Sequence, residues 1–152
     1  FDLERKDRVK YLGVIIDQHL SWKHRINHIA LKTAEYWNYF ETKTFVPLKL
    51  RSLISLYISY GLIAWGQASK SHLEKILILQ KRAVRLINFL NFRTLEIPYF
   101  AQSNILTITM LYLKLSSIVM LDITTNSAPQ YICNLFTSMQ DIHQYNTRAA
   151  SS

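Results

Sequence analysis

The stretch RVKYLGVIIDQHLSWKHRINHIALKTAEYWNYF, residues 8–40, contains the change of hydrophobic period that decides the fold. From Tyr11 to Ile16 an extended chain would carry apolar side chains on both faces, which is typical of a buried strand. From Leu20 onward, large apolar residues instead recur three or four positions apart, which predicts a helix over about residues 21–42. The sequence therefore predicts a short N-terminal β-strand or hairpin that leads into a helix.

The predicted strand raises a question about its neighbours. Gly13 lies within it, and a glycine inside a strand indicates a bulge or a close approach by other backbone. A strand that is apolar on both faces needs paired neighbours and covering layers. Only Phe1 to Leu3 precede it as a candidate partner strand, so we expect residues 9–16 to be incompletely paired within this chain.

Three further helices are predicted beyond the first. One begins at Pro47 and extends to Trp65, one spans about residues 71–89, and one begins at Thr107 and is ended by Pro129. Ser71 and Glu74 have the spacing of a capping box for the middle one. Glycine and proline number only three each, too few for the turns of an all-β fold. The predicted fold is mainly α, a strand or hairpin followed by a bundle of about four helices.

The positive charge is unevenly distributed. Of the 18 Lys and Arg residues, 16 lie within residues 1–98, which carry the whole net charge of +8. Such a distribution favours contact with a polyanion through one region. On the helix over residues 71–89, Lys81, Arg82 and Arg85 avoid the apolar stripe and are spaced to follow a phosphate backbone. The alternative is an ordinary solvated helix face.

A second group of cations lies at the start of the first helix. Lys23, Arg25 and Lys32 accompany Trp22, whose ring is suited either to stacking on a base or to the core. His24 and His28 lie four residues apart on one helix face, but no third ligand lies near them in sequence, so we expect no metal site. The chain also lacks a Gly-rich phosphate loop, a nucleophile elbow and any adjacent pair of Asp residues.

Two observations bear on the compartment of the protein and on its association with membranes. Cys133 is the single cysteine, which excludes an internal disulfide and fits a reducing compartment. The apolar run over residues 52–66 is too short to span a membrane. The run over residues 105–121 is interrupted by Lys114. We therefore expect buried bundle helices, no membrane partner and an intracellular protein, nuclear or cytoplasmic, that is not secreted.

Five blocks of sequence carry a family resemblance. The first, VKYLGVIIDQHLSWKHRI at residues 9–26, fits K-[YF]-L-G-V-x-[IL]-D followed by L-x-W. The third, LEKILILQKRAVRLI at residues 73–87, fits L-x-x-I-x-x-L-Q-K-R-A-x-R-x-I. The others are LISLYISYGLIAWG at residues 53–66, IPYFAQSNILTI at residues 97–108 and HQYNTRAA at residues 143–150. Taken in their order along the chain, the five blocks resemble the region after the palm motifs in LINE-type (non-LTR, jockey-like) retrotransposon reverse transcriptases.

The resemblance implies a division of the chain. Residues 1–18 would end the palm-type sheet, with Leu12 and Gly13 near the palm–thumb junction. Residues 19–128 would form the helical thumb and connection, and residues 129–152 a loosely ordered tail. The partners implied are the RNA template, the DNA primer and the missing palm of the same polyprotein. The nucleic-acid-binding residues expected from the sequence are Lys10, Trp22, Lys23, Arg25, Lys81, Arg82 and Arg85.

The family also limits what these residues do. Its catalytic Asp-Asp pair, with Mg²⁺, belongs to the palm upstream of Phe1, so we expect no cofactor here and no polymerase activity from this fragment alone. Arg25 stands where the family often has histidine. The alternative is a non-catalytic helical interaction or scaffold module from a decayed element. Nucleic-acid binding that weakens steeply with salt distinguishes the two, because only the first requires phosphate neutralisation.

Overall fold

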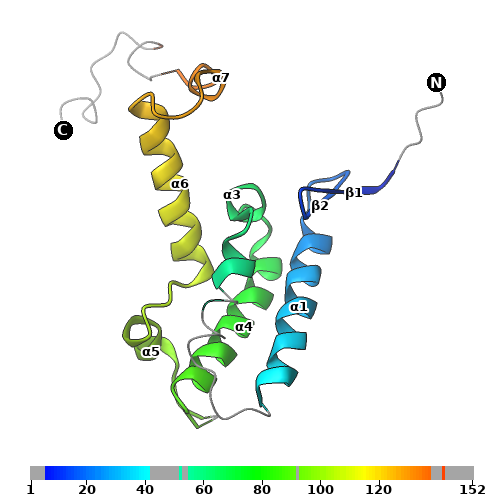
Figure 1. Ribbon diagram of the computed structural model, residues 1–152, viewed down its shortest axis with the longest axis vertical. Coiled ribbons are helices and arrows are strands. Elements are labelled where there is room, and N and C mark those ends of the chain that lie inside the picture. The colour runs from blue at the N-terminus through cyan, green and yellow to red at the C-terminus, as the bar shows by residue number, and fades with distance from the viewer. Residues whose placement is uncertain (1–5, 42–51, 53–54, 92, 138–141, 143–152) are drawn as a thin grey trace. The chain divides into compact units, whose positions relative to one another are not determined.

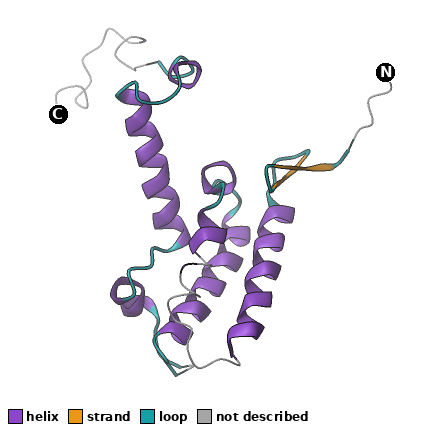
Figure 2. Ribbon diagram, viewed as in Figure 1, coloured by secondary structure: helices purple, strands orange, loops and turns teal. Residues whose placement is uncertain are grey.

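The computed structural model describes residues 6–41, 52, 55–91, 93–137 and 142, and it is mainly α-helical, as predicted (Figure 1, Figure 2). A β-hairpin of β1 (Arg8–Tyr11) and β2 (Val14–Asp17) comes first. The described helices include α1 (Lys23–Glu41), α3 (Leu62–Trp65), α4 (Lys70–Ile87), α5 (Ile97–Gln102), α6 (Ile108–Thr124) and α7 (Gln130–Cys133). Residues 55–59 are helical as well. The chain divides into two compact units after Leu113.

The hairpin corrects the expected single buried strand. β1 pairs antiparallel with β2, from Arg8 opposite Asp17 to Tyr11 opposite Val14, so the first half of the run is itself the partner of the second. Leu12 and Gly13 form the turn with φ of 44° and 79°, and two positive φ values match the right-handed twist of a hairpin. β1 is exposed along its length. The proposed partner segment Phe1 to Leu3 lies outside the described residues.

Asp17 joins the hairpin to α1. Its Oδ1 accepts hydrogen bonds from the amides of His19 and Ser21 at 3.2 and 3.0 Å, and its Oδ2 accepts one from Trp22 at 2.9 Å. Burial raises the pKa of Asp17, but these amide hydrogen bonds outweigh it and hold the pKa below its ordinary value. The carboxylate therefore satisfies amides that lead into the first turn of α1.

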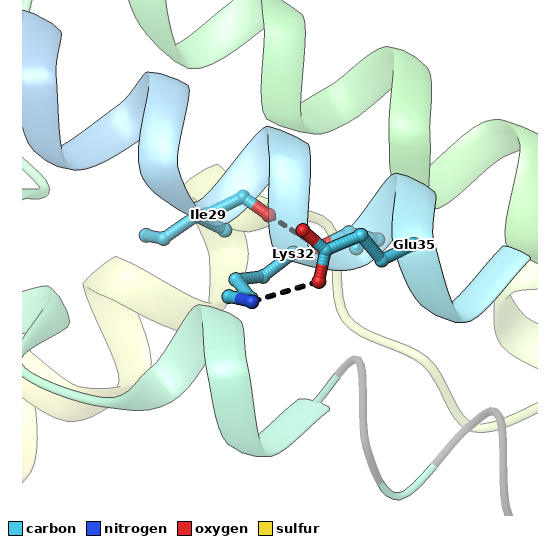
Figure 3. Close-up of polar contacts among 4 residues, drawn as sticks. Ile29, Lys32 and Glu35 are labelled. Atoms are coloured by element: carbon cyan, nitrogen blue, oxygen red, sulfur yellow. Dashed lines mark hydrogen bonds and ion pairs between the residues drawn. The ribbon is translucent and has the colours of Figure 1, made fainter.

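The core of the N-terminal unit lies between α1 and the helices that follow. Figure 1 shows α1 and α4 side by side and running in the same direction, and the two helices contact each other. The predicted apolar stripe of α1 is buried at Ile26, Ile29 and Thr33, and Thr33 satisfies its hydroxyl by donating to the Ile29 carbonyl at 2.8 Å (Figure 3). Fully buried partners from the other helical segments are Ile58, Leu62, Trp65, Ile76 and Val84. Burial of this stripe is what holds α1 in place.

A buried glutamine ties α4 to the residues that enter α6. Gln80 is only 3% exposed; its Nε2 donates to the Leu106 carbonyl at 3.0 Å and its Oε1 accepts from the Ile108 amide at 2.8 Å. Its position on the predicted apolar stripe is therefore explained by a satisfied amide and not by hydrophobicity.

Helix boundaries differ from the sequence-based ones at three places. The helix expected to reach Trp65 is interrupted at Tyr60 and Gly61, where Gly61 has φ of 67° and precedes α3; residues 47–51 lie outside the described part. α4 begins at Lys70 with Ser69 at its N-cap, so the Ser71 capping box is wrong.

The fourth predicted helix is confirmed at its start and wrong at its end. Thr107 Oγ1 accepts a hydrogen bond of 3.4 Å from the Met110 amide, as a cap would. α6 ends at Thr124, and Pro129 instead precedes α7 as its N-cap residue. In the described part of the chain, no helix combines the length and the apolar composition that crossing a membrane requires.

Candidate nucleic-acid interface

The seven predicted nucleic-acid-binding residues differ in their exposure to solvent. Lys10 on β1, Lys23 at the start of α1 and Arg82 on α4 are exposed. Trp22 and Lys81 are half-buried. Trp22 has φ of 61° and lies just before α1, and Asp17 binds its amide.

Arg85 differs from its neighbours on α4. Its guanidinium forms an ion pair with Glu96, whose side chain is buried at 5% exposure. Buried carboxylates require such a counterion because desolvation of an unpaired charge is costly. Arg85 is therefore engaged inside the N-terminal unit, unlike the exposed Arg82, and its phosphate contact stays a prediction.

Arg25 is also buried, at 4% exposure. Its Nη1 donates to the Gly13 carbonyl at 3.0 Å and its Nη2 to the Tyr60 carbonyl at 3.1 Å, while the guanidinium carbon lies 5.7 Å from the centre of the Tyr60 ring. Tyr60 in turn donates its hydroxyl to the Leu12 carbonyl. Arg25 thus links the hairpin turn to the turn before α3 from a buried position, and its expected phosphate contact stays a prediction.

A basic groove lies between the hairpin and α1. This groove has a volume of about 460 Å³. Its polar lining residues are Arg8, Lys10, His24, Asn27 and His28. Arg8 and Lys10 alternate on β1 and therefore share one face of the strand. His24 and His28 share one face of α1 because they are four residues apart.

The groove extends toward α4. Lys75 donates from Nζ to Asn27 Oδ1 at 3.3 Å, which places an α4 cation at the edge of the groove. Arg82 lies two turns further along α4 on the same face, and both side chains are exposed. α1 and α4 lie side by side and run in the same direction (Figure 1), so α4 extends alongside the helix that lines the groove.

The acids near the groove are few among the described residues of α1. Glu35 binds Lys32 at 2.7 Å on the outside of the helix (Figure 3). Burial lowers the pKa of His28, and the positive charges of Arg25, Lys10 and Lys32 lower it further, with Glu35 opposing them. The groove and its surroundings therefore have a positive potential.

Sequence reasoning did not place Arg8 or His24 at a nucleic-acid interface. Both line the groove, Arg8 from β1 and His24 from α1, and Lys75 of α4 binds Asn27 of the same lining. The alternation of Arg8 with Lys10 and the four-residue spacing of the histidines were visible signals. Their convergence depends on how the hairpin folds onto α1, which the spacing alone does not predict.

Comparisons with known proteins do not supply an identification: no protein-family profile, no curated protein and no solved structure matches this chain. Within the part of the chain that the structure describes, no group of three His, Cys, Asp or Glu side chains comes together that would hold a metal ion.

Proposed function

We propose that this chain is the thumb-side part of a non-LTR retrotransposon reverse transcriptase and holds the RNA template and DNA primer through their phosphates. The proposal combines the order of the sequence blocks with one structural observation, the basic groove that β1, α1 and α4 share. Polymerase chemistry would come from a palm carrying the carboxylates and Mg²⁺. The chain would then act within the cell, in the nucleus or cytoplasm.

The groove suits a nucleic-acid backbone more than a small anion. Arg8 comes from β1, whereas Lys75 and Arg82 come from α4; all three are exposed, so they can meet several phosphates in succession. Long flexible cations position a duplex without reading its sequence. Binding that is independent of sequence is what a polymerase needs from its thumb.

The salt dependence of duplex binding tests this proposal. In the full chain, R8Q/K75Q/R82Q should weaken binding to an RNA–DNA duplex about equally for unrelated sequences. The slope of log affinity against log salt should flatten by roughly one for each lost phosphate contact.

A matched variant controls for net charge. K70Q/R93Q/K114Q also removes three exposed cations, and these lie outside the groove. It should retain most of the affinity and the original slope. Equal losses in the two variants would refute the groove, because they would reflect general charge alone. Absence of salt-dependent binding in the unmodified chain would refute the nucleic-acid function itself.

A helical interaction module remains the second candidate, and the C-terminal unit favours it. Ile118, Met120 and Leu121 of α6 and Leu135 after α7 are all exposed apolar side chains. Exposed apolar surface of this kind commonly marks a protein contact. A chain that binds no duplex at low salt but forms a stable complex with another protein would support this candidate instead.

A further inference from the structure

A second hollow lies next to the basic groove, on the other side of Lys10 and His28. It has a volume of about 330 Å³ and is lined by Lys10, Gly13, Arg25, His28, Tyr57 and Tyr60, together with Leu56. We call it the Arg25 pocket. It draws on the hairpin, on α1 and on the helical segment 55–59 with the turn that follows.

The buried charge of Arg25 lacks a counterion. Buried cations in proteins are normally paired with a carboxylate or another anion, because an unpaired charge is expensive to desolvate. The contacts of Arg25 are instead two carbonyls and an aromatic ring, and within the described residues no carboxylate forms an ion pair with it. A guanidinium has five N–H donors, and the buried Nε of Arg25 has no hydrogen-bond partner.

Among the other polar groups of the pocket, Lys10 contributes a second permanent cation. His28 is surrounded by Arg25, Lys10 and Lys32, with Glu35 as the opposing charge, and Tyr57 and Tyr60 line the same pocket. Because burial and these cations lower its pKa, His28 is neutral near pH 7, where its imidazole still has one N–H to donate.

We propose that the Arg25 pocket binds a single phosphate group, with Arg25 as the buried charge and Lys10 and His28 as the outer donors. Arg25 is held by Gly13 and Tyr60, so its planar fork is oriented before the anion arrives. Two permanent cations match the charge of a phosphate monoester and exceed that of a backbone diester. The tyrosine rings and Leu56 provide an apolar wall beside the phosphate.

This inference rests on the proposed function for the source of the phosphate. A held nucleic acid offers two sources of the same chemistry, a backbone diester and a terminal monoester. A bound anion would also raise the pKa of His28, because a nearby negative charge favours the protonated imidazolium.

Inorganic phosphate added to the full chain at constant ionic strength is the first test. The Nε–H resonance of Arg25, assigned as the one that R25K removes, should shift in a saturable manner, while equal ionic strength from sodium chloride should leave it in place. K10M and H28N should each weaken phosphate binding about tenfold, the loss of one charge-assisted hydrogen bond. K114M, an exposed cation of the other compact unit, should bind as the unmodified chain does.

Oligonucleotides then distinguish the two sources. A 5′-phosphorylated strand that shifts the Arg25 resonance more than its unphosphorylated form identifies a terminal monoester, and equal shifts identify the backbone. The proposal is overturned if phosphate moves no Arg25 resonance, or if K10M and H28N bind phosphate as well as K114M does. If the chain still binds duplex in that case, the basic groove is supported and the pocket is refuted. Phosphate binding in a chain that binds no duplex supports the pocket and refutes only the nucleic-acid source.

Discussion

Replacing Asp17 with asparagine should destabilise the junction between the hairpin and α1 without changing the size of the side chain. The carboxylate accepts three amide hydrogen bonds, two on Oδ1 and one on Oδ2. Asparagine keeps one acceptor oxygen, but its NH₂ group then faces an amide donor. Hydrogen bonds to charged groups contribute roughly 1.5–3 kcal/mol each and are not additive. We therefore expect D17N to lower the free energy of unfolding by about 2–4 kcal/mol at pH 7.

The pH dependence of this loss provides a second, independent measurement. Because the folded-state pKa of Asp17 lies below its unfolded value, its contribution is fully present above the unfolded pKa and is lost as the pH falls through the folded one. The difference between the unmodified chain and D17N should therefore be largest near neutral pH and should shrink below about pH 4. Urea titrations followed by circular dichroism at pH 7, 5 and 3.5 would measure it. A D17N loss below about 0.5 kcal/mol, or one that is the same at every pH, would refute this account of the junction.

Two further substitutions test the packing of the N-terminal unit. R85M leaves the buried Glu96 carboxylate unpaired and should lower the free energy of unfolding by about 3–5 kcal/mol, whereas R85M/E96Q should recover part of this loss. If chemical denaturation shows that R85M is as stable as the unmodified chain, Arg85 is not engaged with Glu96. G66A places a Cβ against Tyr112 Cδ2 and 2.7 Å from the Leu62 carbonyl oxygen, and it should lower Tm by several degrees at a cost of about 1–3 kcal/mol. An unchanged Tm in calorimetry would contradict the close approach of Gly66 to Tyr112.

The sequence by itself determined the mainly α class, because apolar residues three or four apart can be buried together only if the chain is helical. Ile26, Ile29 and Thr33 on α1 are buried as that spacing predicts, and so are Ile76, Ala83 and Val84 on α4. The concentration of positive charge in residues 1–98 was equally visible. The resemblance to reverse transcriptases stays a prediction, as do the domain boundaries that it implies.

Only the tertiary structure decided how each cation is used. Arg25 and Arg85 look like Lys23 and Arg82 in a sequence pattern, since each lies outside an apolar stripe. Burial separates them: one guanidinium meets two carbonyls and the other meets Glu96, whereas Lys23 and Arg82 remain in solvent. Helical periodicity reports which face a residue occupies, but not which partner that face will meet. The turn at Leu12 and Gly13 was undecidable for the same reason, because the hairpin is held onto α1 by contacts with Arg25 and Tyr60 that come from distant parts of the chain.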